Sequence, residues 1–203
     1  MIVLSYTTLN SLILEPHTWL CKQMGLKTFS NIYMLEGKKA HRIIQAHVSG
    51  KQKSLLLNNL NGAYFPIVEE EEFDKRLEFY YEINDKYAIH GYMDGKDKPN
   101  PTKGLEIKTS SKPWGLMQFY RLPQWKMAAL AQPSLKEMWF ITATRDLSRV
   151  EKPYMIPVTE KHKQEGLEFV KKGISIIESG DFDYKGVGKS RYCFYENCPF
   201  CGK

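Results

Sequence analysis

The sequence lacks any apolar run approaching the roughly 20 residues that a membrane-spanning helix needs. The segment from Met1 to Leu14 also lacks the basic leading region and the small-residue cleavage site of a secretory signal peptide. No internal repeat or low-complexity linker divides the chain. We therefore expect a single domain, no membrane insertion and a cytoplasmic location.

Cysteine is scarce, with four in 203 residues. The composition, with 42% hydrophobic and 26% charged residues, is typical of a globular domain. The net charge of +6 is compatible with a polyanionic partner, because Lys and Arg contacts to phosphate release condensed counterions. This charge is spread along the chain, except for the acidic run Glu69–Glu72. We expect that run to be a solvated segment before a strand.

Apolar periodicity divides the chain into a small number of helices and strands. In chain order we expect a helix over 35–48, a hairpin of two strands over 77–93 with its turn at 84–86, a strand over 104–109, a helix over 124–131, a strand over 138–144 and a helix over 159–178. This mixture of helices and strands predicts an α/β domain.

Two acidic residues and a lysine are predicted to meet at the end of the hairpin. Alternation along a strand places Glu106 and Lys108 on one face with Ile107 pointing into the core, and Asp94 ends the neighbouring strand. Two carboxylates suit Mg2+ or Mn2+, and a lysine beside them could orient water or stabilise a phosphoryl transition state. Taken alone, Glu-Ile-Lys on a strand equally fits a surface ion pair. Together, the three groups predict metal-dependent phosphodiester hydrolysis.

Four short motifs occur in a fixed order around these residues. They are Gly37-Lys-Lys-Ala-His41 on the first predicted helix, His90-Gly-Tyr-Met-Asp94 at the hairpin end, Leu105-Glu-Ile-Lys-Thr109 on the next strand and Gln124 on the following helix. In this order they resemble the G-x-x-x-H, G-x-x-D, E-x-K-T and helix glutamine of the PD-(D/E)xK nuclease superfamily. The similarity is to its RecB-like branch, which includes CRISPR-associated nucleases and viral exonucleases.

This resemblance implies a restriction-endonuclease-like core, with a mixed central sheet flanked by helices. It implies one nuclease domain over 1–203, with the core at about 35–145 and a tail at about 180–203. The implied metal ligands are His41, Asp94, Glu106 and the backbone carbonyl of Ile107, and the implied catalytic residues are Asp94, Glu106, Lys108 and Gln124. His41 also fits a packed helix histidine, and Gln124 a purely structural amide. Ala128 stands where the branch usually has a tyrosine.

The four cysteines are split between the two ends of the chain. Cys21 lies near the start, and Cys193, Cys198 and Cys201 form C-x4-C-x2-C. Four such thiols could close around a 4Fe–4S cluster or a Zn2+ ion and tie the two ends together. The split resembles the iron–sulfur subgroup of RecB-like nucleases and implies a 4Fe–4S cluster, although the usual spacing there is C-x2-C-x5-C. Zn2+ is the alternative, followed by free thiols or a disulfide.

Aromatic and basic residues interleave around the last motif, where Tyr120, Arg121 and Trp125 are candidate contacts to bases and phosphates of single-stranded DNA. The aromatic side chains equally fit a protein core. No function is assigned to His17 or His162.

These observations favour a bacterial, archaeal or viral deoxyribonuclease dependent on Mg2+ or Mn2+, with exonuclease action more consistent than endonuclease action. We expect its DNA partner to be a single strand or an end, in recombination, repair or replication, with a recombination or replication protein as a further partner. The alternatives are a CRISPR-adaptation-type nuclease and a non-catalytic DNA-binding or assembly subunit on the same fold.

Overall fold

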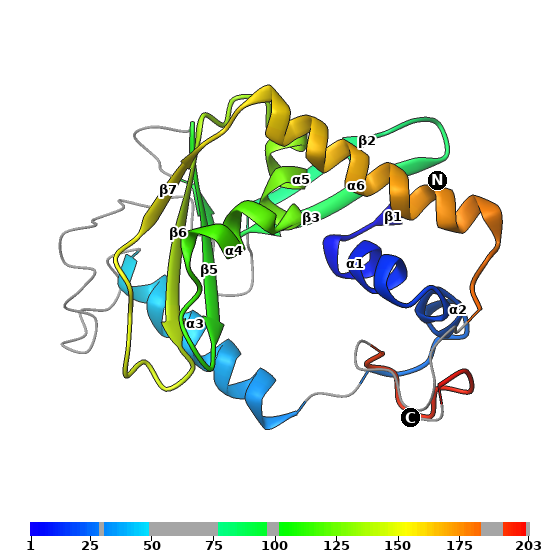
Figure 1. Cartoon of the computed structure of the whole chain (residues 1–203), viewed down its shortest axis with the longest axis horizontal. Coiled ribbons are helices and arrows are strands. Elements are labelled where there is room, and N and C mark those ends of the chain that lie inside the picture. Colours follow the sequence, from blue (N-terminus) through cyan, green and yellow to red (C-terminus); the bar gives the residue numbers. More distant parts are fainter. Residues whose placement is uncertain (29–30, 49–76, 97–101, 184–192, 202–203) are drawn as a thin grey trace.

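The computed structural model describes residues 1–28, 31–48, 77–96, 102–183 and 193–201. In chain order its elements are β1 (Ile2–Leu4), α1 (Tyr6–Leu14), α2 (His17–Gln23), α3 (Ile32–Val48), β2 (Leu77–Glu82), β3 (Tyr87–Met93), β4 (Gly95–Lys96), β5 (Lys103–Ser110), α4 (Leu116–Arg121), α5 (Pro123–Ala131), β6 (Glu137–Thr144), β7 (Tyr154–Pro157) and α6 (Glu160–Ser179) (Figure 1). The acidic run Glu69–Glu72 lies outside the described residues.

Two small mixed sheets meet at Asp94. One has the strand order β1-β3-β2 and the other β4-β5-β6-β7, and each contains one parallel pair, β1 with β3 and β5 with β6. The chain passes from β3 to β4 through Asp94, whose backbone amide donates to the Leu105 carbonyl at 3.2 Å. This passage places Asp94 beside β5, so the sheet junction itself positions the first predicted acid.

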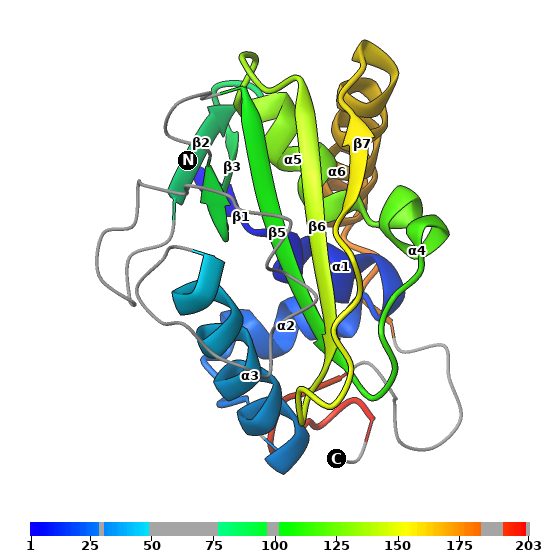
Figure 2. The same cartoon turned by 90° about the vertical axis from the view of Figure 1, so that its left-hand side faces the viewer.

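The two faces of β5 and β6 pack against different apolar clusters. Leu105 and Ile107 pack with Ile44 of α3 on one face, as alternation predicts. Met138 and Phe140 of β6 point to the other side, into a larger core shared with α1, α5 and α6. Figure 2 shows α3 on one side of this sheet and α4, α5 and α6 on the other. The predicted fold, a mixed sheet flanked by helices, is therefore confirmed.

Helix α6 packs unusually close to α5. A Cβ atom at Gly166 would stand 2.6 Å from the carbonyl oxygen of Lys126, so only glycine permits this approach. Two turns earlier, Thr159 caps α6 by accepting a hydrogen bond from the His162 amide. Helix α5 is thereby fixed against the sheet, and Gln124 with it.

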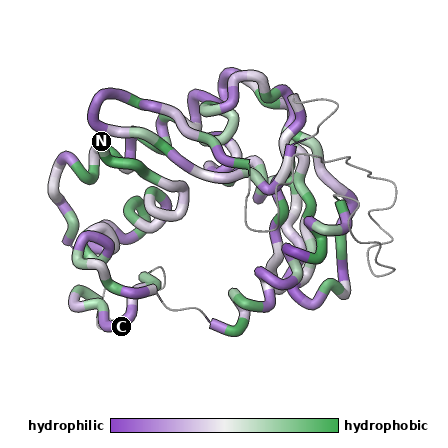
Figure 3. Tube along the Cα trace, turned by 180° about the vertical axis from the view of Figure 1, so that it is seen from behind, coloured by the Kyte–Doolittle hydropathy of each residue, from purple (hydrophilic) through white to green (hydrophobic). Residues whose placement is uncertain are grey.

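The predicted helices and strands are all present, but the structure adds elements at the N-terminus as well as β4, α4 and β7. Strand β1 pairs in parallel with β3, and α1 packs against α6. Figure 3 shows β1 as apolar and the β2–β3 turn as polar. A strand of three residues is too short to show a periodic pattern. Its pairing partner is also more than 80 residues away in sequence, so no local signal indicates the pairing. Among the described residues, no helix is long and apolar enough to cross a membrane.

Candidate active site

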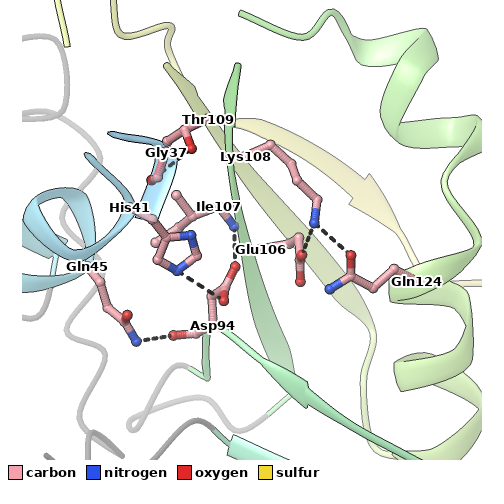
Figure 4. Close-up of polar contacts among 9 residues, drawn as sticks. All are labelled: Gly37, His41, Gln45, Asp94, Glu106, Ile107, Lys108, Thr109 and Gln124. Carbon is pink, nitrogen blue, oxygen red and sulfur yellow. Dashed lines mark hydrogen bonds and ion pairs between the residues drawn. The ribbon is translucent and has the colours of Figure 1, made fainter. Parts of the chain in front are cut away.

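Asp94 is held by groups from α3 and β5 (Figure 4). Its Oδ1 lies 3.2 Å from His41 Nε2, and its Oδ2 accepts the backbone N–H of Ile107 at 2.7 Å. Gln45, one helical turn after His41, donates its side-chain amide to the Asp94 carbonyl at 3.0 Å. Asp94 is thus fixed in both its backbone and its carboxylate.

Glu106, Lys108 and Gln124 form a second group on the α5 side of the same strand. Lys108 Nζ donates to Glu106 Oε1 at 2.5 Å and to Gln124 Oε1 at 2.6 Å. Glu106 is 2% exposed whereas the Lys108 side chain is 22% exposed, so removal of the lysine would leave a buried carboxylate uncompensated. Gln124 therefore fixes the lysine directly, a contact that the order of motifs alone did not specify.

The glycine of the first motif allows α3 to approach β5. Thr109 Oγ1 donates to the Gly37 carbonyl at 3.0 Å, and a Cβ on Gly37 would lie 3.2 Å from the same hydroxyl. His41 follows one turn later on the face that meets Asp94. The spacing of Gly37 and His41 thus has a packing reason as well as a chemical one.

The two carboxyl groups are pushed toward different protonation states. Burial raises the pKa of Glu106 to about 7, although Lys108 opposes the shift. Burial also acts to raise the pKa of Asp94, but His41, Lys108 and the Ile107 amide outweigh it and hold that pKa below its usual value. Burial lowers the pKa of Lys108, and the two carboxylates more than reverse this. Near neutral pH, Asp94 and Lys108 are charged and Glu106 is the group that titrates.

The donors around Asp94 fit a hard divalent cation. Octahedral Mg2+ at about 2.1 Å from each ligand sets neighbouring ligand atoms about 3 Å apart, which is close to the separation of His41 Nε2 and Asp94 Oδ1. His41 Nε2 is buried and faces Asp94 Oδ1, so the two atoms lie where they could share one ion. Glu106 adds a second buried carboxylate across β5. Ile107 follows Glu106 in sequence and donates its backbone N–H to Asp94, and its carbonyl remains a predicted ligand.

A groove of about 880 Å³ opens beside these residues, and part of its lining was missed by sequence reasoning. Lys38, Arg42, Lys108 and Arg145 line it, and no described lining residue is acidic. The Arg145 guanidinium lies 4.9 Å from the centre of the Tyr33 ring. Lys38 lies within the first motif on α3 and Arg42 directly follows it, a signal available in the sequence. Arg145 follows β6 and is joined to them only by the fold.

The predicted DNA contacts lie elsewhere. Trp125 is fully buried, and its indole N–H donates to the Phe119 carbonyl at 2.8 Å, so its ring is part of the core. Tyr120 and Arg121 line a separate hollow of about 430 Å³ that does not include the acidic pair. Tyr6 of α1 was not predicted, yet it is close enough to Lys108 and Glu106 to interact electrostatically with both.

The four cysteines meet in a buried cluster, called the thiol cluster below, formed by Cys21, Cys193, Cys198 and Cys201. Cys21 Sγ and Cys198 Sγ are 3.3 Å apart. Burial raises the pKa of Cys193 to about 12. It acts likewise on Cys198, but the Cys21 thiol and the amides of Phe200 and Cys201 outweigh it and lower the pKa of Cys198. The predicted meeting of the two chain ends through their cysteines is confirmed.

Solved structures share this fold. SSO0001 matches with a TM-score of 0.54 at 18% identity, over 86% of this chain and 76% of that protein. An alkaline exonuclease from Laribacter hongkongensis, LHK-Exo, matches with a TM-score of 0.52 at 11% identity, over 87% of this chain and 88% of the exonuclease. Its complex with dAMP gives 0.53 at the same identity. No protein-family model matches the sequence, and the search of curated proteins finds no match. The chain therefore has the fold of this exonuclease.

Proposed function

We propose that this chain is a metal-dependent deoxyribonuclease, acting as an exonuclease on single-stranded DNA or DNA ends in recombination, repair or replication. One observation carries the proposal: Asp94, Glu106 and Lys108 converge at β5 beside a groove lined by basic residues. The exonuclease fold supports it. The proposal takes 1–203 as one nuclease domain, working in the cytoplasm.

His41, Asp94, Glu106 and the Ile107 carbonyl would hold Mg2+ or Mn2+. When bound, the ion lowers the pKa of coordinated water and neutralises charge on the phosphoryl oxygens. Among the side chains, Lys108 acts on the reacting atoms, because Glu106 and Gln124 hold its ammonium group in one place. From there it orients the attacking water or stabilises negative charge on the phosphorane-like transition state. Gln124 acts by positioning Lys108.

The groove is suited to a DNA strand without reading its sequence. Lys38, Arg42 and Arg145 can contact phosphates, and the 59%-exposed Tyr33 can stack on a base. Because His41, Ile107 and Lys108 line the same groove, a strand lying along it would pass next to residues that contact Asp94 and Glu106. The solved exonuclease complex contains dAMP, a deoxynucleotide, which supports DNA as the substrate class. Tyr120, Arg121 and Trp125 have weaker claims to substrate contact, because they lie outside this groove.

The thiol cluster is proposed to be a structural metal centre. The resemblance implies a 4Fe–4S cluster on Cys21, Cys193, Cys198 and Cys201, with Zn2+ as the alternative. Either centre would join the tail to the start of the chain without taking part in cleavage.

The deciding experiment incubates 5′- and 3′-labelled single- and double-stranded DNA with the protein and Mg2+, Mn2+ or EDTA. We expect metal-dependent release of short products from single strands or ends, at a rate that falls at least ~100-fold in Lys108→Ala and Glu106→Ala. Lys171→Ala, on the exposed side of α6, is the matched control and should cleave normally. Equal cleavage by all variants would refute the site. Absence of cleavage by the wild type, with DNA still bound, would favour a non-catalytic DNA-binding or assembly subunit.

A further inference from the structure

A histidine that the sequence left without a function stands among the thiols. The ligand atoms of His17, Cys193, Cys198 and Cys201 all lie within 4.8 Å of one another, and all four residues are buried. His17 comes from α2, near the N-terminus, and the cysteines come from the last described segment. Donors from both ends of the chain thus meet at one point, away from Asp94 and Glu106.

Helix α2 offers two donors on one face. His17 and Cys21 are four residues apart and therefore stack one helical turn from each other. Cys21 Sγ lies against Cys198 Sγ at 3.3 Å. Five donor side chains consequently surround a site that needs four.

The spacing of the donors fits one ion. Tetrahedral Zn2+ with ligands at about 2.3 Å sets its ligand atoms about 3.8 Å apart, in keeping with four donors that are all within 4.8 Å. A 4Fe–4S cluster places four irons between its thiolates, whose sulfurs must then stand farther apart than ligands sharing one ion. The observed donors do not fit the cluster that the resemblance implies.

We propose that His17, Cys193, Cys198 and Cys201 form a three-thiolate, one-imidazole site for a single Zn2+ ion, with Cys21 packed beside it as a thiol that is not required for binding. This proposal is independent of the proposed nuclease function, because none of its residues lies in the active site. The ion would anchor the tail of the chain onto α2.

The surroundings of His17 support a ligand role. Glu15 Oε2 lies 3.7 Å from His17 Nδ1, and a carboxylate on that side favours Nε2 as the ligating atom. The Phe200 ring, between two of the thiols in sequence, is 5.9 Å from the imidazole ring. Backbone pairing of Thr28 with Tyr195 holds the tail next to the N-terminal segment. The imidazole is thus oriented and shielded at the same point where the thiols converge.

The test uses the full chain, purified anaerobically, with zinc and iron measured per chain and a visible spectrum recorded. We expect about one zinc per chain and no iron in the wild type and in Cys21→Ser. His17→Ala should bind zinc at least ~100-fold more weakly, whereas His90→Ala, a histidine outside the site, should bind normally.

Co2+ substitution identifies the ligands even where His17→Ala folds poorly. The wild type and Cys21→Ser should show the d–d spectrum of three sulfurs and one nitrogen, and His17→Cys should retain the metal and shift to the spectrum of four sulfurs. Four results overturn the proposal: stoichiometric iron with the broad absorption of a cluster, no bound metal, loss of zinc in Cys21→Ser with retention in His17→Ala, or a four-sulfur spectrum in the wild type.

Discussion

The active site and the thiol cluster use opposite kinds of donor and opposite kinds of scaffold. Asp94, Glu106 and Lys108 lie on or beside the paired strand β5, where alternation and register fix their directions. The thiols Cys193, Cys198 and Cys201 lie in a tail without a helix or an extended strand among its described residues. Regular structure can preorganise oxygen donors before an ion arrives, whereas an irregular tail needs an ion to hold it. The first site should therefore govern rate and the second stability.

Asp94→Asn gives the largest expected effect and separates the two sites most sharply. Removing the carboxylate charge next to His41 should reduce cleavage about 1,000-fold, because the proposed divalent ion would lose a buried anionic ligand. Zinc content should be unchanged. The measurement is single-turnover cleavage alongside metal analysis, and loss of zinc together with activity would show that the sites are coupled.

Cys198→Ser is the converse change. Loss of a thiolate from the site should destabilise the fold by about 3 kcal/mol or more and lower Tm by roughly 10 °C. Cleavage per folded molecule should stay within about threefold, since Cys198 touches none of the catalytic residues in any described contact. Thermal unfolding with and without a zinc chelator measures the first effect. A wild type whose Tm is insensitive to the chelator would contradict it.

Glu106 should make Mg2+ binding depend on pH. Because burial raises its pKa to about 7, a proton competes with the ion below that pH and is gone above it. Affinity should therefore rise up to tenfold per pH unit on approaching pH 7 from below and level off above it. Titration of the protein with Mg2+ at pH 6, 7 and 8 tests whether the affinity rises with pH. Glu106→Gln should bind weakly with a flat profile, and an unchanged slope in that variant would assign the titration to another group.

Arg145→Ala should produce the smallest effect, confined to substrate binding. Loss of one phosphate contact should weaken single-strand binding about threefold to tenfold and reduce the salt slope by about 0.7. Arg149, four residues away and paired with Glu151 outside the groove, supplies the matched control. Fluorescence anisotropy at several salt concentrations measures both the affinity for the single strand and its salt slope. Equal behaviour of the two alanine variants would remove the groove from the substrate path.

The order of motifs was sufficient to predict that most of the candidate site residues lie together, for a physical reason. Glu106 and Lys108 are two residues apart on a strand, so local geometry alone puts them on one face. A tight hairpin similarly brings Asp94 to the adjoining strand end. The sequence could not show that Trp125 is core, because an aromatic residue on a short helix has the same pattern whether it packs or stacks.

The sequence by itself determined the mixed α/β fold, the acid–lysine pair and the concentration of thiols at the chain ends. Only the tertiary structure decided that His17 joins those thiols and that Arg145 joins Lys38 in one groove. Periodicity and spacing report which residues share a face of one element. Contacts between elements far apart in sequence depend on how those elements pack, and packing of α2 against the tail and of α3 against β5 created both surfaces.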